Sequence, residues 1–308
     1  MQGKQVSRLK ACLCLALLYL SWGGSFLGMK FALTGFPPVA QNGIRLCGAG
    51  LLMLALLPLT KHGRPTGFME IVHYFVLAFF VMFMNNVCQA VGQQSVPSGM
   101  TALLYGAVPL FMVLGDWLVL RGPRPGRGQT FAIGGAMLGM AVLTFSGGAG
   151  VACPLSGMLV ILLGVVCFVA GSLYAKRFLA DAGMSLYGGM ALTMLFGGLL
   201  SLPAAWLMGE SFDVSGFTAA SLGGMMFLTF FTSVLGYLCY YWLLAHTRVM
   251  VAVSFAYIDP VIAVILGALF GSEALSPGVL ASCVLIVGSV MGGLYAGSSG
   301  KRRSVRER

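Results

Sequence analysis

Charged residues are scarce in this chain. Only 8% of its 308 residues are Asp, Glu, Lys or Arg, and only 8 residues are acidic. A soluble globular domain usually carries about 25% charged residues, so this composition excludes one. Between the apolar segments there is also no stretch long enough for a separate soluble domain. We therefore expect an integral membrane protein.

Sequence motifs of common catalytic and cofactor sites are also absent. The chain has no H-E-x-x-H, G-x-S-x-G or phosphate-loop sequence, and its 3 histidines and 8 cysteines show no metal-binding spacing. These absences argue against an enzyme, and we expect no cofactor and no metal. A membrane-embedded enzyme would require a second titratable group close to Asp259.

Long apolar runs are what the chain does contain. They are about twenty residues long, which is the length that a transmembrane helix needs, and Gly, Pro or basic clusters separate them. The pattern predicts an all-α integral membrane fold with ten transmembrane helices. The expected spans are 11–33, 38–60, 71–91, 99–120, 129–147, 155–175, 185–207, 217–245, 249–270 and 277–297.

The basic residues predict the orientation of these spans. Of the 18 lysines and arginines, all except Lys30 and Arg45 lie at the two ends or in alternate loops, while the opposite loops carry only acids such as Glu210. Cytoplasmic loops are enriched in Lys and Arg, so both termini are expected in the cytoplasm. The first apolar run continues to Leu33 without a cleavage site, which predicts a retained helix. The net charge of +10 thus reflects topology, and we expect no nucleic-acid partner.

A faint internal repeat divides the chain into two halves. An offset of 151 residues places Pro109 on Pro260 and Cys88 on Cys239 without a gap. The expected units are a first repeat at 11–147, a second at 155–297 and a basic cytoplasmic tail at 298–308. Because each half has an odd number of spans, the two halves must have opposite orientations. Inverted repeats with interrupted helices are typical of transporters, whose substrate site lies near the midplane.

Asp259 is the most informative single residue. It lies next to Pro260 near the middle of the ninth span, and a charge at that depth costs about 2.5–3.5 kcal/mol on insertion scales. A carboxylate in this position could bind and release a proton during a transport cycle. Alternatively, it bonds to neighbouring helices and stabilises a bend. Pro109 and Pro260 are both expected to interrupt their helices.

The third span carries an unusual number of amides. Asn85, Gln89 and Gln93 are spaced by four residues, which places them on one helical face, with Asn86 and Gln94 beside them. This face either lines a polar cavity or forms hydrogen bonds between helices.

The first two spans contain further polar candidates. Trp22 and Ser25 flank two glycines and suggest the wall of a cavity, although close helix packing explains glycines equally well. Lys30 and Arg45 lie at similar depth near the outer end. They could receive a carboxylate or phosphate, or bond to loop carbonyls.

Tyrosines complete the set of candidate cavity residues. They are Tyr105, Tyr237, Tyr241 and Tyr257. Aromatic residues near the end of a span often form an interfacial belt instead. Tyr237 and Tyr241 would line the cavity only if their helical face turns inward.

The motifs quoted above, taken in order, resemble those of a known family. The second half, with GYLCYYWLLAHTRVMVAVSFAYIDPVIAV, and the first, with WGGSF and ALLYGAVPLF, are similar to EamA-type carriers of the drug/metabolite transporter superfamily. The resemblance implies ten helices in two inverted five-helix repeats around a central cavity. It also implies export of amino acids and other metabolites. Arg121-Gly122 replaces the Glu usual at the end of the fourth span, whereas Glu273 keeps its counterpart.

The leading hypothesis is therefore a secondary-active transporter in the cytoplasmic membrane. It would export a small metabolite such as an amino acid by alternating access, with proton coupling through Asp259 as a subordinate hypothesis. The expected partners are the lipid bilayer and a small-molecule substrate, and a homodimer is left open. The alternative is a non-transporting membrane scaffold or sensor subunit, against which the polar third span argues.

Overall fold

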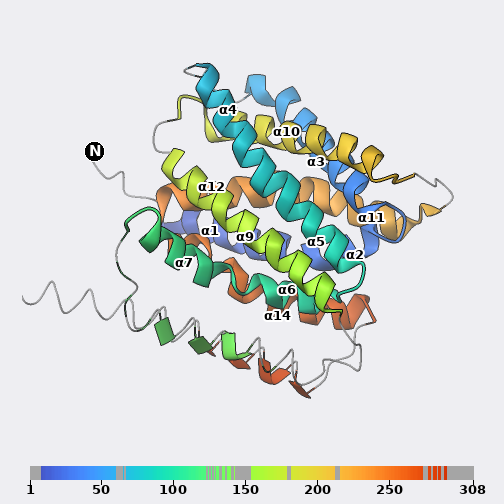
Figure 1. Ribbon diagram of the computed structural model, residues 1–308, viewed down its shortest axis with the longest axis vertical. Helices are drawn as coiled ribbons and strands as arrows, with labels where there is room; N and C mark the ends of the chain where they lie inside the picture. Colours follow the sequence, from blue (N-terminus) through green and yellow to red (C-terminus); the bar gives the residue numbers. More distant parts are fainter. Residues whose placement is uncertain are drawn as a thin grey trace, which may run out of the picture.

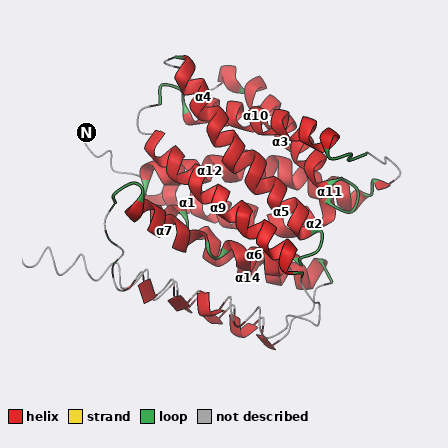
Figure 2. Cartoon of the chain, in the orientation of Figure 1, coloured by secondary structure: helices red, strands yellow, loops and turns green. Residues whose placement is uncertain are grey.

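Helices are the only regular structure in the described part of the chain (Figure 2). The computed structural model describes residues 8–59, 65, 67–122, 154–178, 182–211 and 216–272, with scattered positions between 124 and 142 and between 277 and 289. The first half contains α1 (Arg8–Gly23), α2 (Ser25–Ala32), α3 (Pro38–Ala55), η1 (Leu57–Leu59), α4 (Phe68–Leu77), the π-helical η2 (Ala78–Met84), α5 (Asn85–Gln93), α6 (Ser98–Tyr105) and α7 (Val108–Leu118). The second half contains α9 (Leu155–Phe178), α10 (Leu186–Leu207), α11 (Ala219–Phe227), the π-helical η5 (Leu228–Gly236), α12 (Tyr237–His246), α13 (Val249–Ala252) and α14 (Phe255–Phe270).

Among the described residues, 7 helical segments are long and apolar enough to cross a membrane. They are Arg8–Ala32, Phe68–Gln93, Ser98–Leu118, Leu155–Phe178, Leu186–Leu207, Ala219–His246 and Val249–Phe270. The 18-residue α3 is less apolar because it contains Gln41, Asn42 and Arg45. Eight of the ten expected spans thus fall on helices. The other two, 129–147 and 277–297, lie largely outside the described residues, so ten helices remain a prediction.

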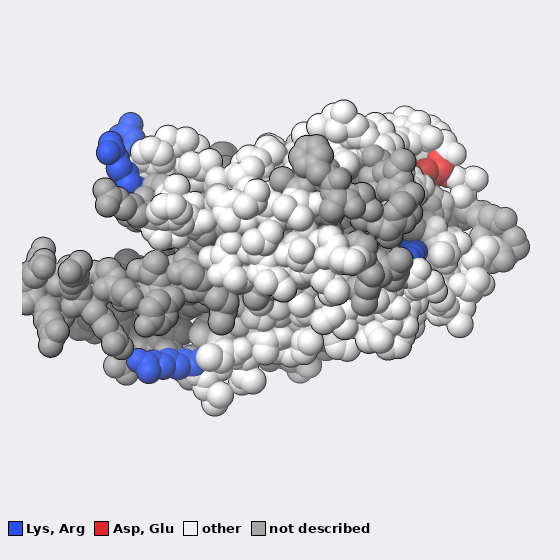
Figure 3. Space-filling view, turned by 90° about the horizontal axis from the view of Figure 1, so that it is seen from below, with Lys and Arg blue, Asp and Glu red and all other residues white. Residues whose placement is uncertain are grey.

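The distribution of polarity is the reverse of that in a soluble protein. Large apolar side chains point outward, with Trp206 78% and Leu207 76% exposed, whereas Gln41, Asn42 and Arg45 are at most 1% exposed. On the face shown in Figure 3, charged side chains lie at the two ends of the molecule and an uncharged belt separates them. Such a belt matches the hydrocarbon layer of a membrane, where an unsatisfied polar group has a high free-energy cost. The chain is a multi-pass membrane protein.

The helices of the two halves pack against each other reciprocally. Where a helix of the first half contacts a helix of the second, the counterparts of these two helices also contact each other. α3 packs along α10, its counterpart in the second half, more extensively than any other pair (Figure 1). α5 packs on α9, and reciprocally α12 and η5 pack on α1. Likewise α1 packs on α14, and α9 packs on α6 and α7. This reciprocity fits a two-repeat architecture with interlocked halves.

Local structure repeats between the halves as well. α6 begins at Ser98 and α13 at Val249, which is the 151-residue offset seen in the sequence. The π-helices η2 and η5 also occupy matching positions, since they begin at Ala78 and Leu228. The halves therefore share irregular features and not only helix number.

We predict that the α3–α10 contact is sensitive to one added methyl group. A Cβ at Gly198 would lie 2.7 Å from the backbone nitrogen of Cys47 and 3.0 Å from the Gly43 carbonyl oxygen, so the helices would have to separate. Overpacking typically costs about 1–3 kcal/mol, so Gly198→Ala should lower the melting temperature of the detergent-purified protein by several degrees. Gly223→Ala is the matched control, because nothing lies within 4 Å of the added atom. Equal melting temperatures for the two variants would contradict this view of the interface.

Candidate functional site

Three of the crossing segments are interrupted, and the interruption of the third lies close to its start. α1 gives way to α2 at Gly24, α6 to α7 at Gly106 and Ala107, and α13 to α14 at Val253 and Ser254. Such breaks expose backbone polar groups, which at membrane depth are tolerated only where protein or a cavity surrounds them. The interruptions therefore indicate where in the helix bundle a cavity lined by polar groups is expected.

The proline positions relate differently to these breaks in the two halves. Pro109 lies in the first turn of α7, directly after its break, where proline is well tolerated. Pro260 lies inside α14, several residues beyond the break at Val253 and Ser254. The same offset thus aligns the prolines and the helix starts, but not the interruptions themselves.

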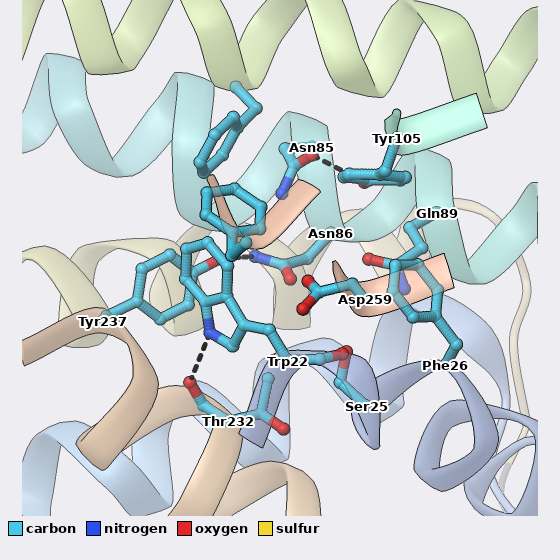
Figure 4. Close-up of a pocket in the computed structure, with 12 residues that line it drawn as sticks. Trp22, Ser25, Phe26, Asn85, Asn86, Gln89, Tyr105, Thr232, Tyr237 and Asp259 are labelled. Atoms are coloured by element: carbon cyan, nitrogen blue, oxygen red, sulfur yellow. Dashed lines mark hydrogen bonds between the residues drawn. The ribbon is translucent and has the colours of Figure 1, made fainter. Parts of the chain in front are cut away.

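A cavity of about 40 Å³ lies between these interrupted segments and α5, α9, η5 and α12 (Figure 4). A volume of this order accommodates a few water molecules. Its lining residues are Trp22, Ser25, Phe26, Asn85, Asn86, Gln89, Tyr105, Phe168, Thr232, Tyr237, Phe255 and Asp259. Both halves of the chain contribute to it.

Asp259 is the one charged side chain in this lining. It is 2% exposed, and its Oδ1 atom has no hydrogen-bond partner among the described residues. In Figure 4 its carboxylate points into the cavity toward Asn86. A buried carboxylate without a hydrogen bond is costly, so this group is poised to take a proton, a water molecule or a ligand.

The amides of α5 are positioned by the π-helical turn that precedes them. A π-helix displaces the main-chain hydrogen bonds by one residue and leaves carbonyl oxygens available. Asn86 Nδ2 donates to the carbonyl oxygens of Val81 and Met82, each at 3.0 Å, and Asn85 Nδ2 donates to Val81 O at 3.4 Å. Asn85 Oδ1 in turn accepts from the Tyr105 hydroxyl at 2.7 Å. The amides thus join irregular backbone to the cavity wall.

Aromatic side chains form a second part of the cavity wall. The Trp22 ring lies 4.5 Å from Phe255, 5.1 Å from Tyr237 and 5.9 Å from Phe168, measured between centroids. Trp22 Nε1 donates to the Thr232 carbonyl oxygen at 3.2 Å, within the π-helical η5. Trp22 is therefore held by both packing and a hydrogen bond.

Two other candidates from the sequence, Arg45 and Lys30, do not line this cavity. Arg45 is buried on α3, donates to Asn42 Oδ1 at 2.9 Å, and lies near enough to Tyr105 and Tyr237 to interact electrostatically with them. Lys30 Nζ donates to the Gly271 carbonyl oxygen at 2.6 Å, at the C-terminal end of α14.

Three further candidates lie outside the cavity lining. Gln93 Nε2 donates to Phe26 O at 2.6 Å, while Tyr241 and Tyr257 are at most 1% exposed. Tyr241 does not lie in an interfacial belt; its ring packs 5.0 Å from that of Tyr240. Any role of these residues in substrate binding remains a prediction.

Phe168, Thr232 and Phe255 line the cavity but have no distinguishing sequence signal. Phenylalanine and threonine are ordinary components of membrane helices, so only packing singles them out. Asn86 and Phe26 had a signal, since they adjoin the amide face and the WGGSF motif. In the described part of the chain, no group of three His, Cys, Asp or Glu side chains could hold a metal ion.

The fold consists of two related sets of helices around a cavity with polar residues in its lining, which is typical of one class of multi-pass membrane proteins. The chain belongs to the EamA-like transporter family, which matches residues 9–145 and again residues 155–294. The resemblance seen in the sequence is thereby confirmed.

Individual relatives agree with this assignment. The uncharacterized inner membrane transporter YedA of Escherichia coli (strain K12) is 29% identical, over 84% of this chain and 82% of YedA. The uncharacterized transporter YvbV of Bacillus subtilis (strain 168) is 27% identical, over 93% and 92% of the respective chains. Among solved structures, one crystal structure superposes with a TM-score of 0.70 at 20% identity, over 93% of this chain and 96% of its own, which supports the fold alone.

We predict that the cavity is reached by water and that other buried hydroxyls are not. In a background without native cysteines, Ser25→Cys should react with a small methanethiosulfonate reagent at least about tenfold faster than Ser172→Cys, because a thiolate forms readily only with access to water. Ser172 is the matched control, since it is 0% exposed and does not line the cavity. Rates measured by mass spectrometry in membrane vesicles would decide, and equal rates would contradict a wet cavity.

Proposed function

We propose that this protein is a secondary-active transporter of the cytoplasmic membrane that exports a small metabolite, such as an amino acid, by alternating access. The observation that carries this proposal is the cavity lined by Asp259, three amide side chains and aromatic rings, to which interrupted segments of both halves contribute. Sites of this kind occur near the midplane of transporters built from inverted repeats. The relatives named as transporters support the same conclusion.

Alternating access requires that the halves separate at one end while they stay closed at the other. At the proposed cytoplasmic end, Lys176 of α9 forms an ion pair with Asp116 of α7 at 2.5 Å. At the proposed outer end, Glu210 accepts hydrogen bonds from the backbone nitrogens of Val39 at 3.1 Å and Ala40 at 2.8 Å. Both contacts join the two halves, so each is suited to break when its end opens.

The substrate is best identified in living cells. Strains that lack or overproduce the protein would be compared for growth on toxic concentrations of amino acids and their analogues. Resistance on overproduction to one class of compound would identify exported cargo. Sensitivity on overproduction would instead reverse the proposed direction of transport, and no difference for any compound would argue for a scaffold or sensor.

Proton coupling through Asp259 gives a separate prediction. Asp259→Asn keeps the size of the side chain but removes the proton-binding oxygen, so a pH gradient should no longer drive accumulation of the identified cargo in proteoliposomes. Downhill exchange of the cargo at saturating concentration should persist in this variant. Glu70→Gln is the control, since it removes a carboxylate outside the cavity and its amide oxygen can still accept from the Met184 backbone nitrogen. Unchanged pH-driven accumulation in Asp259→Asn would refute coupling through this residue.

We also predict that both termini lie in the cytoplasm. Nearly all lysines and arginines flank that side in the proposed orientation, and such clusters resist translocation. Green fluorescent protein fused to either end should fluoresce, whereas alkaline phosphatase at either end should be inactive. Phosphatase activity at one end only would imply an odd number of spans.

A further inference from the structure

The charge inside the cavity is negative and has no counter-ion in the cavity lining. Asp259 is the one ionisable acid there, and no Lys, Arg or His accompanies it. Arg45 interacts electrostatically with Tyr105 and Tyr237 but does not itself line the cavity. A ligand that enters this space therefore meets a carboxylate with a vacant hydrogen-bond position on Oδ1.

Most hydrogen-bond donors around the cavity are already committed. Tyr105 donates to Asn85 Oδ1, and Asn86 Nδ2 donates to main-chain oxygens and to the Tyr237 hydroxyl at 3.2 Å. Ser25 Oγ donates to Trp22 O at 2.6 Å, and Trp22 Nε1 donates to Thr232 O. An anionic group would require free donors, whereas a donor-rich cation requires acceptors. The Gln89 amide and the Tyr237 hydroxyl can still donate, but the two Asp259 oxygens and the amide oxygens of Asn86 and Gln89 give the cavity more acceptors than remaining donors.

Aromatic rings supply most of the remaining wall. Six of the lining residues are aromatic, and four of these, Trp22, Tyr237, Phe168 and Phe255, cluster with Trp22 at the centre. The electron-rich faces of such rings attract ammonium groups, and the attraction strengthens away from water. Negative charge, acceptors and aromatic rings thus favour the same sign of ligand.

We propose that the cavity recognises an organic cation, an ammonium group on an apolar or aromatic body, with Asp259 as its counter-ion. The inference rests on the proposed transport function and narrows its substrate class from small metabolites in general to amines without a carboxylate, in place of amino acids. The observed volume suits the ammonium group and its first atoms, so a larger body enters only when one end of the molecule opens.

Three compounds with the same aromatic ring but different charge test the proposal on the purified, full-length protein. Phenethylamine is a cation, phenylalanine a zwitterion and 3-phenylpropionate an anion at neutral pH. Binding would be measured by titration calorimetry and by the fluorescence of the tryptophans. We expect phenethylamine to bind at least about tenfold more tightly than the other two, since an unpaired charge or carboxylate in this site is penalised. Equal or tighter binding of either carboxylate compound overturns the proposal, as does the absence of phenethylamine binding at millimolar concentration.

Variants locate the site independently. Asp259→Asn should weaken phenethylamine binding by at least about tenfold, because it removes the counter-ion and keeps the size and shape of the side chain. Glu70→Gln should leave the affinity unchanged, since it removes equal charge outside the cavity. Unchanged affinity in a monodisperse Asp259→Asn protein overturns the proposal. If that variant does not fold, the comparison of the three compounds on the unaltered protein still decides.

Transport assays separate this proposal from the one on which it rests. Liposomes loaded with each compound would be assayed for exchange with its radiolabelled form. Exchange of phenylalanine without exchange of phenethylamine would preserve transport and overturn the cation site. Tight, Asp259-dependent binding of phenethylamine without any exchange would support the cation site and count against transport.

Discussion

The exclusion of unsatisfied polar groups from hydrocarbon is the constraint on which the whole structure depends. Because lipid offers no hydrogen bonds, the polar side chains of α3 and α5 turn inward, and some of them find partners on other helices. Asn42, for example, donates both to the Met82 carbonyl oxygen and to the Ser201 hydroxyl. These bonds tie α3 to η2 and α10. The apolar residues are left to face the membrane.

Close packing of the two halves brings the irregular segments together. Glycines such as Gly43 and Gly198 let α3 and α10 approach to backbone contact, and the reciprocal packing of α5 on α9 and of α12 on α1 follows around them. The helix breaks and the π-helical turns then converge on one small space. Asp259 lies there with an oxygen that has no hydrogen-bond partner among the described residues, which is tolerable only where a proton, water or a ligand can reach it.

Periodicity predicted the face on which a residue lies but not the neighbour that it meets. Asn85 and Gln89 line the cavity as a shared face suggests, yet Gln93, one turn further along, bonds to the Phe26 carbonyl oxygen. Lys30 and Arg45 have similar depth in the sequence, but one caps the end of α14 and the other is buried against Asn42. Tyr241 is buried because its face of α12 turns toward the core, which a helical repeat alone does not specify.

Hydropathy and composition were enough to predict a helical membrane protein and the positions of eight spans, while the order of residues and motifs predicted the repeat and the family. The 151-residue offset even located matching helix starts at Ser98 and Val249. The membership of the cavity came from packing, because Phe168, Thr232 and Phe255 acquire their role only through contacts between helices distant in sequence. The same is true of the charge balance at Asp259, since its surroundings come from both halves.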